Sequence, residues 1–432
     1  MTHVTRNVLV VSPYFPPSTL AGVHRARHLV KHLPSFGWKP VLLCVDEAFH
    51  EQRLDPGLAK LTPPSLELVK VSAVPIAAAR LFGIGDIGLR ALPSLALAVA
   101  RLLRSRPISA ILISGSPFYP MLMSRWIKRR YHAPIVLDFQ DPWVSRWGAQ
   151  QTGGKAALAH RLARLLEPCA LRGCDFITSV SHIQNEEMAG RYPWLDASRM
   201  AAIPIGGDRE DFDSTRARTG EAGEVRLDPT RINLTYVGTF LPRAEPLARC
   251  LFEALAMLRA REPELAARLR LNFVGTSNQP NDRISSRVTP IALEAGVGDL
   301  VAETPQRVLY LEALTLLAQS NGLLLIGSDE PHYTASKIYP ALMSGRPYLS
   351  LFHAMSSAHA ILAGAGGGLS FAFSTAQELA ALRPALADGL RALALSPERF
   401  GRADPAIYAP YEAGAVAGRY AGIFDRLANR PG

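Results

Sequence analysis

The chain has 432 residues, of which 48% are hydrophobic and 19% are charged, a composition typical of a globular protein too long for one ordinary core. No window of about 20 apolar residues runs uninterrupted, so no membrane-spanning helix is predicted. The short apolar run near the N-terminus ends in proline, unlike a signal peptide. The formal net charge is +10, yet no dense basic tract with interleaved aromatics and no zinc-finger or RNP-like pattern occurs, so a nucleic-acid partner is not favoured. Scattered arginines suit an anionic membrane surface, a phosphate-bearing substrate or simply a solvated surface.

The cysteines and one apolar segment bear on the cellular compartment and on membrane contact. Neither the cysteine spacing nor nearby histidines suggest zinc, so a reduced, cytosolic compartment is expected for Cys44, Cys169, Cys174 and Cys250. The apolar segment 73–107 is interrupted by charges and proline. Residues 95–103 within it are predicted to form a core-facing helix, with a helix lying in a membrane interface as the alternative.

The first half of the chain alternates short apolar runs with helical segments. Strands are predicted at 7–12, 39–45, 110–115, 134–139, 175–181 and 200–206. Helices are predicted between them at 22–37, 118–131, 155–171 and 182–190. Strands that alternate with helices at this spacing indicate a parallel, doubly wound sheet.

A polar, charge-rich segment at 208–231 is predicted to be a linker, after which the pattern restarts. The second half has predicted strands at 232–238, 269–275, 322–327 and 347–352, and predicted helices at 245–260, 309–319 and 336–344. The sequence therefore predicts an N-terminal domain over 1–215 and a C-terminal domain over 230–410. A last helix within 411–432 is expected to pack back on the first domain.

Doubly wound sheets bind ligands at the carboxyl ends of their strands, so residues that directly follow a strand are the candidate site residues. Two such domains opposed across a linker predict one interdomain cleft. After the first strand, Gly22 begins a helix whose free N–H groups suit an anion, with Arg25 and Arg27 about one turn further along. A glycine needed only for the turn is the alternative.

A second candidate site follows the strand at 134–139. Asp138 and Asp141 lie in "DFQDPW", beside Trp143. Carboxylates at a strand end can hold the hydroxyls of a polar substrate, and an aromatic ring suits the apolar face of a sugar. These two aspartates are the predicted catalytic residues. Helix capping by Asp141 ahead of Pro142 is the alternative.

Strand ends in the second domain carry small residues and cations. Gly238 and Thr239 end its first strand, and Arg243 follows shortly before a helix, which suits a diphosphate. Gly275 ends the next strand, with Thr276 after it. Ordinary turn glycines are the alternative for both.

The third strand end in this domain is the most polar. It reads "IGSDEPHYTASKIYPALMSGRP" and offers Ser328, Asp329, Glu330, His332, Ser336 and Lys337. Ser336 is expected to cap a helix, which places Lys337 in its first turn. A cation there opposes the helix dipole unless an anion is bound nearby. A bound phosphate would resolve the conflict, and a solvated lysine is the alternative.

These motifs together resemble bacterial glycosyltransferases of family 4, which have the GT-B fold. The matching segments follow the family's order along most of the chain: "VLVVSPYFPPSTLAGVHRARHL", "VLDFQDPW", "CDFITSVS", "IPIGGDREDF", "LTYVGTF" and "SKIYPALMSGRPYL". The resemblance implies an α/β protein with two Rossmann-like domains facing across a cleft. It also implies sugar transfer from a nucleotide sugar, usually with retention and without a metal. The C-terminal domain would bind the donor, and the N-terminal domain would bind an acceptor that is often lipid-linked.

The resemblance also assigns roles by position. Gly22 would lie near the donor phosphates, and Arg243 and Lys337 would bind them. Many members have two glutamates in the donor loop, which hold the sugar and the ribose; here His332 and Pro340 stand in those places. Glu330 or Asp329 could take the first role, and the ribose contact has no obvious replacement.

The sequence thus predicts a metal-independent glycosyltransferase with no cofactor beyond its nucleotide-diphosphate sugar. The expected acceptor is a hydroxyl of a saccharide or lipid-linked molecule in bacterial cell-surface or exopolysaccharide synthesis. The chain is expected in the cytoplasm, with peripheral contact at the cytoplasmic face of the inner membrane. The alternatives are a non-catalytic GT-B-like scaffold subunit of a polysaccharide assembly complex and a nucleotide-sugar epimerase.

Overall fold

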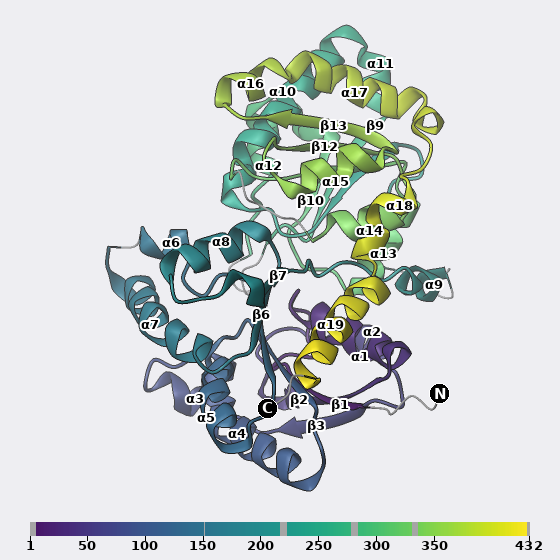
Figure 1. Cartoon of the computed structure of the whole chain (residues 1–432). Coiled ribbons are helices and arrows are strands. Elements are labelled where there is room, and N and C mark those ends of the chain that lie inside the picture. The colour runs from purple at the N-terminus through teal and green to yellow at the C-terminus, as the bar shows by residue number, and fades with distance from the viewer. Residues whose placement is uncertain (1–5, 151, 217–222, 278–283, 331–335, 430–432) are drawn as a thin grey trace. The chain divides into compact units, whose positions relative to one another are not determined.

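The computed structural model describes residues 6–150, 152–216, 223–277, 284–330 and 336–429. The chain divides into two compact units (Figure 1). Unit 1 is Met1–Ile205 with Ala413–Gly432, and unit 2 is Gly206–Glu412. The C-terminal helix therefore belongs to the same unit as the N-terminus.

Unit 1 is built on a seven-stranded parallel sheet in the order β3-β2-β1-β4-β5-β6-β7. Its strands are β1 (Arg6–Val11), β2 (Trp38–Val45), β3 (Glu67–Val71), β4 (Ala110–Gly115), β5 (Ile135–Phe139), β6 (Phe176–Ser179) and β7 (Met200–Ala202). Its helices are α1 (Val23–His32), α2 (Pro56–Ala59), α3 (Ile76–Arg80), α4 (Ile87–Ser105), α5 (Met123–Tyr131), α6 (Arg146–Ala149), α7 (Gly154–Leu171), α8 (His182–Arg191) and α19 (Ala413–Ala428). The strand order reverses between β1 and β4, which is the topological switch point of a doubly wound sheet.

Helices cover both faces of this sheet because its central strands are apolar on both sides. In β1, Leu9 and Val11 pack with α4, α5 and α7 on one face. Val8 and Val10 pack on the other face with α1 and α19. Figure 1 shows α19, in yellow, beside α1. Tyr420 of α19 is fully buried in this second layer.

Unit 2 is a six-stranded parallel sheet in the order β10-β9-β8-β11-β12-β13, again reversing after its first strand. Its strands are β8 (Ile232–Val237), β9 (Leu269–Val274), β10 (Val301–Thr304), β11 (Gly322–Ile326), β12 (Tyr348–His353) and β13 (Gly368–Phe373). Its helices are α9 (Glu210–Arg216), α10 (Glu245–Arg261), α11 (Pro263–Arg268), α12 (Thr289–Glu294), α13 (Tyr310–Gln319), α14 (Ile338–Met343), α15 (Ser357–Ala365), α16 (Ala376–Ala381), α17 (Arg383–Leu395) and α18 (Pro405–Tyr408).

The predicted α/β class and every predicted strand are present, and the structure adds three strands, β3, β10 and β13. The expected linker also contains α9, a seven-residue helix that packs on α13 within unit 2. Among the residues described, no helix is long and apolar enough to cross a membrane.

Candidate functional site

Three strand ends meet at the centre of the carboxyl edge in unit 2, because β8 lies between β9 and β11. Gly238 follows β8 with φ +130°, and Gly275 follows β9 with φ +74°. These are backbone conformations that residues with a side chain rarely adopt. Each glycine N–H continues the sheet, Gly238 donating to Val274 O at 2.9 Å and Gly275 to Thr304 O at 2.8 Å. The edge therefore presents bare backbone at the switch point, where a ligand can approach closely.

Lys337 lies beside this bare backbone. Its Nζ donates a hydrogen bond to the Tyr236 hydroxyl and lies 4.0 Å from the centre of the same ring. A side chain added at Gly238 would contact the methylene chain of Lys337. Burial lowers the pKa of Lys337 to about 7, and no carboxylate among the described residues compensates for the lost solvation. Lys337 is half-exposed as a residue, but its amine is poorly solvated. An anion bound nearby would stabilise the charged form of this amine.

Arg243 lies in the short helical turn before α10 and forms two surface ion pairs. Its Nε contacts Asp329 Oδ1 at 2.6 Å, and Nη1 contacts Glu330 Oε1 at 3.0 Å. The Asp329 N–H also donates to the Arg243 carbonyl at 3.3 Å. The loop after β11 is thereby held against the loop after β8, so that both cations and both acids occupy one edge of the sheet.

The other predicted residues of this edge differ in how available they are. Ser328 is buried, and its Oγ accepts from the Glu330 N–H at 3.2 Å. Thr239 offers its carbonyl to the Tyr236 hydroxyl at 2.8 Å. Thr276 donates to Glu303 at 2.6 Å and is buried. Ser336 is exposed and does not cap α14, whose N-cap residue is Lys337 without a side-chain cap bond. His332 lies outside the described residues.

The carboxyl edge of unit 1 contains Gly22 at the start of α1. Gly22 has an ordinary helical φ of −60°, so its backbone angles alone do not require glycine. Its carbonyl accepts from Gln140 Nε2 at 3.2 Å, and the same nitrogen donates to Ser114 Oγ at 2.7 Å. Gln140 therefore joins the ends of β4 and β5 to the start of α1.

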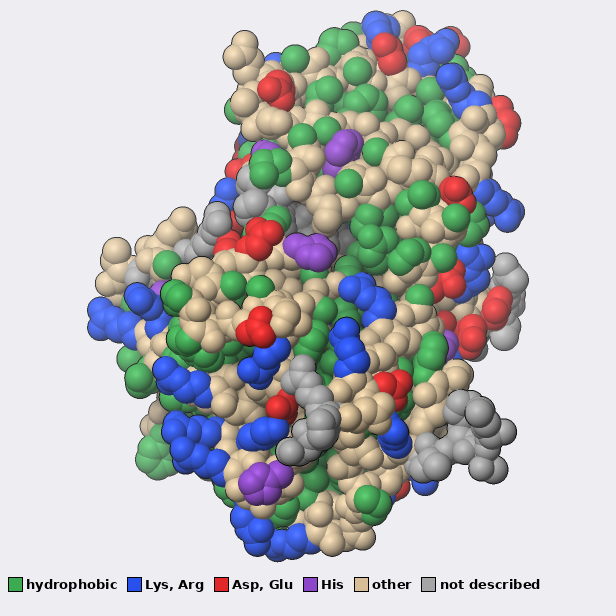
Figure 2. Space-filling view, viewed as in Figure 1, with side chains coloured by type: hydrophobic (Ala, Val, Ile, Leu, Met, Phe, Trp, Pro, Cys, Tyr) green, Lys and Arg blue, Asp and Glu red, His purple; other side chains and the backbone are tan. Residues whose placement is uncertain are grey.

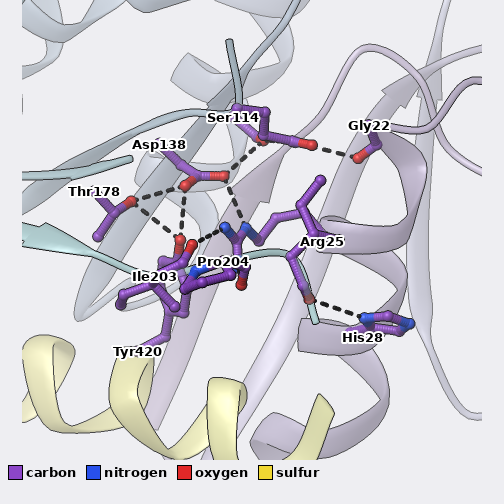
Figure 3. A network of polar contacts seen from close by, with 11 residues as sticks. Gly22, Arg25, His28, Ser114, Asp138, Thr178, Ile203, Pro204 and Tyr420 are labelled. Atoms are coloured by element: carbon purple, nitrogen blue, oxygen red, sulfur yellow. Dashed lines mark hydrogen bonds and ion pairs between the residues drawn. The ribbon is translucent and has the colours of Figure 1, made fainter. Parts of the chain in front are cut away.

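Arg25 and Asp138 are paired inside unit 1 rather than presented to a ligand. Both side chains are fully buried, with Arg25 Nε 3.2 Å from Asp138 Oδ2. Arg25 also donates to the carbonyls of Ile203 and Pro204 and lies over the ring of Tyr420. Figure 3 shows these groups converging from β5, α1, α19 and the segment after β7.

Asp138 accepts three further hydrogen bonds. They come from Ser114 at 3.2 Å, Thr178 at 2.9 Å and Tyr420 at 2.7 Å. A carboxylate so fully engaged is the anchor of a buried network, and this arrangement favours a structural role for Asp138 and for Arg25. Arg27 is likewise buried, with its guanidinium against His24 and His28.

Asp141 differs from Asp138 because its side chain reaches solvent. The protein atoms around it nevertheless raise the pKa of the Asp141 carboxyl by desolvation. The next helix, α6, begins only at Arg146, so Asp141 does not cap it. Nearby, Trp143 stacks on Phe118 with ring centres 5.3 Å apart. Asp141 is thus the available carboxylate of the predicted catalytic pair.

Sequence reasoning did not single out Tyr236 or Gln140. Tyr236 lies inside an apolar strand run, where a buried tyrosine is usually a core residue. Its position two residues before Gly238 was the available signal, because alternate residues of a strand point to the same face. Gln140 directly follows β5 between the two aspartates, so its strand-end position was the corresponding signal.

The N-terminal half of the chain matches one protein-family model. Residues 21–206 match the model of the family described as Glycosyl transferase 4-like domain. The match covers almost all of unit 1 before the chain enters unit 2. It includes Gly22, Asp138 and Asp141. No curated protein sequence matches the chain.

Solved structures resemble the chain over nearly its whole length. Sucrose-phosphate synthase from Thermosynechococcus elongatus is 17% identical with a TM-score of 0.60, covering 98% of this chain and 99% of that one. Alr3699/HepE from Anabaena, in complex with UDP-glucose, is 14% identical with a TM-score of 0.61, covering 97% and 99%. An alpha,alpha-trehalose-phosphate synthase (UDP-forming) from Burkholderia vietnamiensis is 11% identical with a TM-score of 0.61, covering 98% and 100%. Residues 21–206 therefore resemble the glycosyl transferase 4-like domain, and the chain as a whole has the two-unit α/β GT-B fold of these solved structures.

Proposed function

We propose that the protein transfers a sugar from a nucleotide-diphosphate sugar to a hydroxyl acceptor, with retention of the anomeric configuration. The observation that carries the proposal is the pair of cations, Arg243 and Lys337, at the switch point of unit 2. They lie at the strand-end edge that also presents Gly238 and Gly275. Such an edge suits a diphosphate, because cations and bare backbone there stabilise negative charge at the carboxyl ends of the strands.

Each cation has a distinct part in this proposal. Charge accumulates on the departing nucleoside diphosphate as its bond to the sugar breaks. Lys337 is poorly solvated before the donor binds, so it gains more from a phosphate than a fully hydrated lysine would. Arg243 presents a planar guanidinium that can bind two phosphate oxygens at once.

The acids of the same edge suit a metal-independent reaction. Asp329 and Glu330 each contact Arg243, which supports a role in holding that arginine rather than in binding a divalent cation. In a retaining transfer, a phosphate oxygen of the leaving group can itself take the proton of the acceptor hydroxyl. The proposal therefore needs no separate base and no cofactor.

The acceptor is proposed to bind at the carboxyl edge of unit 1, where Asp141 is available to hold a hydroxyl and Trp143 offers an aromatic surface. We propose a saccharide or lipid-linked acceptor in bacterial cell-surface or exopolysaccharide synthesis, on the cytoplasmic face of the inner membrane. The UDP-glucose complex of Alr3699/HepE, a protein of the same fold, supports a nucleotide sugar as the donor.

A thermal-shift panel of nucleotide sugars tests the proposal. At least one donor should raise the melting temperature, and Arg243→Ala and Lys337→Ala should each weaken its binding by about tenfold, the loss expected for one charge-assisted contact. Arg249→Ala is the matched control, since Arg249 lies on α10 and pairs with Glu245 and Glu294 instead. If the folded protein shows no shift with any donor, the proposal is wrong.

A non-catalytic scaffold subunit is the second candidate, and Pro340 favours it. Pro340 lies in α14. Many members of the family that the sequence resembles have a ribose-binding glutamate at this position, and the proline side chain cannot accept a hydrogen bond. Donor binding without hydrolysis or transfer, across a panel of lipid and saccharide acceptors, would support this alternative. Turnover with any acceptor would exclude it.

A further inference from the structure

We propose that the outer face of α4, α5 and α7 is a docking surface for a bilayer that contains anionic phospholipids. The surface comprises the exposed side chains of these three helices on the side away from the sheet. The inference deepens the proposed function by naming the surface that would bring the enzyme to its acceptor. The proposed function explains only why the protein would bind a membrane. The surface itself is inferred from the charge and exposure of its side chains.

Nearly all of the net charge comes from this part of the chain. Residues 87–171, which begin with α4 and end with α7, contain twelve lysines and arginines against three acids, a net charge of +9 out of +10 for the whole chain. Two of the three acids, Asp138 and Glu167, are fully buried. The outer face of the three helices is therefore almost uniformly basic. Figure 2 shows the basic side chains gathered at the lower left, where Figure 1 places α4, α5 and α7.

The exposed cations of this surface have no carboxylate partners among the described residues. They are Arg101, Arg104, Arg125, Arg129, Arg130, Lys155, Arg161 and Arg164. In unit 2, by contrast, several exposed arginines are paired, as Arg261 is with Asp388 and Arg391 with Glu262. Unpaired cations on one face repel each other, and an external anionic surface relieves that repulsion.

Large apolar side chains lie among these cations. On α7, Leu158 and Leu165 are 58% and 66% exposed, and Leu162 between them is also exposed. Spacings of four and three residues align these leucines in one stripe along the helix. Trp126 of α5 and Leu97 of α4 are exposed as well. A helix with a leucine stripe flanked by arginines is suited to the boundary between headgroups and acyl chains.

The three helices present this face together. Their inner sides pack into one core layer, through residues such as Leu95, Ile127 and Ala170, and the opposite face of the sheet is covered by α1 and α19. The outer sides consequently point away from the sheet in the same general direction. A broad basic and apolar face of this kind matches a planar bilayer better than a narrow ligand.

An exposed apolar pair extends the surface toward the carboxyl edge of unit 1. Leu81 and Phe82 are 83% and 82% exposed in the connection that leads from α3 into α4. β3, which precedes α3, ends at the carboxyl edge of the same sheet as β5, with three strands between them. A bilayer bound at α4, α5 and α7 would then contact the same unit that carries the proposed acceptor site.

Nucleic acid explains these features less well. A phosphate backbone would account for the arginines but would leave the leucine stripe on α7 exposed. Protein contacts to single strands add aromatic platforms for the bases, whereas the apolar side chains of α7 are aliphatic. The combination of leucines and arginines therefore favours lipid.

Vesicle sedimentation of the purified full chain tests the proposal. The protein should sediment with vesicles of phosphatidylethanolamine and phosphatidylglycerol and not with phosphatidylcholine alone, and raising salt from about 0.1 M to about 0.5 M should weaken binding. The triple variant Arg125→Glu, Arg161→Glu, Arg164→Glu should lose about tenfold or more in partitioning. The control variant Arg268→Glu, Arg399→Glu, Arg402→Glu carries the same charge change in unit 2 and should retain most of the binding.

The leucine stripe is tested separately by Leu158→Ser with Leu165→Ser. This variant should bind anionic vesicles at low salt but lose the binding that survives at high salt, whereas Leu293→Ser with Leu395→Ser in unit 2 should behave as wild type. Circular dichroism and a donor thermal shift confirm that each variant is folded.

Three results would overturn the proposal. They are no binding of the wild type to anionic vesicles, equal losses in both charge-reversal triples, and binding to single-stranded RNA in place of vesicles. Self-association that the leucine variant abolishes would instead assign the surface to a second copy of the chain. A protein that binds vesicles but shifts with no nucleotide sugar would keep this surface and lose the proposed function.

Discussion

Lys337 Nζ is hydrogen-bonded to the Tyr236 hydroxyl and lies over the ring of the same tyrosine, 4.0 Å from its centre. The hydroxyl oxygen and the ring face both stabilise a cation, but neither carries a full negative charge. Desolvation therefore dominates and lowers the pKa of Lys337 to about 7. Under the proposed function, a bound diphosphate would supply the negative charge that Lys337 lacks.

The first prediction is that donor binding takes up a proton. At about pH 6 Lys337 is already protonated, whereas above pH 7 it is largely neutral until a bound diphosphate raises its pKa. Affinity for a nucleotide-diphosphate sugar should therefore fall as pH rises from about 7 to about 8.5, by up to about tenfold per pH unit. The donor's own phosphates are both esterified and do not titrate in this range.

Isothermal titration calorimetry in buffers of different ionisation enthalpy measures this proton uptake. Lys337→Arg serves as the control, because an arginine stays protonated and should bind with little dependence on pH. A pH-independent affinity in the wild type would mean that Lys337 is already charged before the donor binds.

A second prediction concerns the acids that hold Arg243. Asp329→Asn removes the charge that contacts Arg243 at 2.6 Å and keeps a side chain of the same size. The pair is exposed to solvent, so it contributes about 1 kcal/mol or less. Freed from this partner, Arg243 should bind the donor diphosphate up to about fivefold more tightly.

Fluorescence or calorimetric titration with the donor checks this gain. Glu294→Gln, which removes a partner of Arg249 instead, should change nothing. Weaker donor binding in Asp329→Asn would show that the carboxylate orients Arg243 rather than competing with the phosphate.

The sequence predicted the central strands of both sheets well, because strands buried on both faces appear as continuous apolar runs. β4 and β11 are of this kind, and both were located within a residue or so. β3 was missed because it is an edge strand with alternating exposed residues, including Lys70. β13 was missed because it begins at the last glycine of "GAGGG", which has the composition of a loop.

The site was predictable only in part, for a different reason. Strand-end glycines and nearby cations can be recognised locally, and Gly238, Gly275 and Lys337 do come together. Arg25 lies in the helix after β1 and Asp138 lies near the end of β5, but their partners are each other, 113 residues apart in the chain. The neighbouring sequence does not distinguish a buried arginine that belongs to a hydrogen-bond network from an arginine that binds a phosphate.

The third prediction tests the backbone at the end of β8. Gly238→Ala places a side chain at φ +130°, a conformation that costs about 1–3 kcal/mol, although the added carbon would meet Lys337 only at ordinary contact distance. Thermal unfolding followed by circular dichroism should show lower stability, and donor affinity should fall because the bare backbone is covered. Gly190→Ala in α8, where nothing lies near an added carbon, should leave stability equal or raise it by up to about 1 kcal/mol. Unchanged stability in Gly238→Ala would show that the strand end relaxes freely.

The fourth prediction separates a structural role of Asp138 from a catalytic one. Asp138→Asn would leave Arg25 buried without a compensating charge, which costs about 3–5 kcal/mol of the free energy of unfolding. Tyr420→Phe removes one hydrogen bond to the same carboxylate and should cost about 1.5–3 kcal/mol. Tyr420 is on α19, so this loss would also measure how strongly the C-terminal helix stabilises unit 1.

Tryptophan fluorescence can monitor this loss in unit 1 alone, because all five tryptophans of the chain precede residue 205 and none is in unit 2. In urea titrations followed by fluorescence, both variants should unfold at lower denaturant concentration than the wild type, with Asp138→Asn the less stable. Donor binding by folded protein should stay unchanged, since Arg243 and Lys337 belong to unit 2.

Asp141→Asn is the matched comparison. The Asp141 side chain reaches solvent, so this variant should leave the unfolding curve in place while reducing transfer to the acceptor. If Asp138→Asn were as stable as the wild type but could not transfer the sugar, Asp138 would be a catalytic residue after all, and the buried network would not be what holds α19 to unit 1.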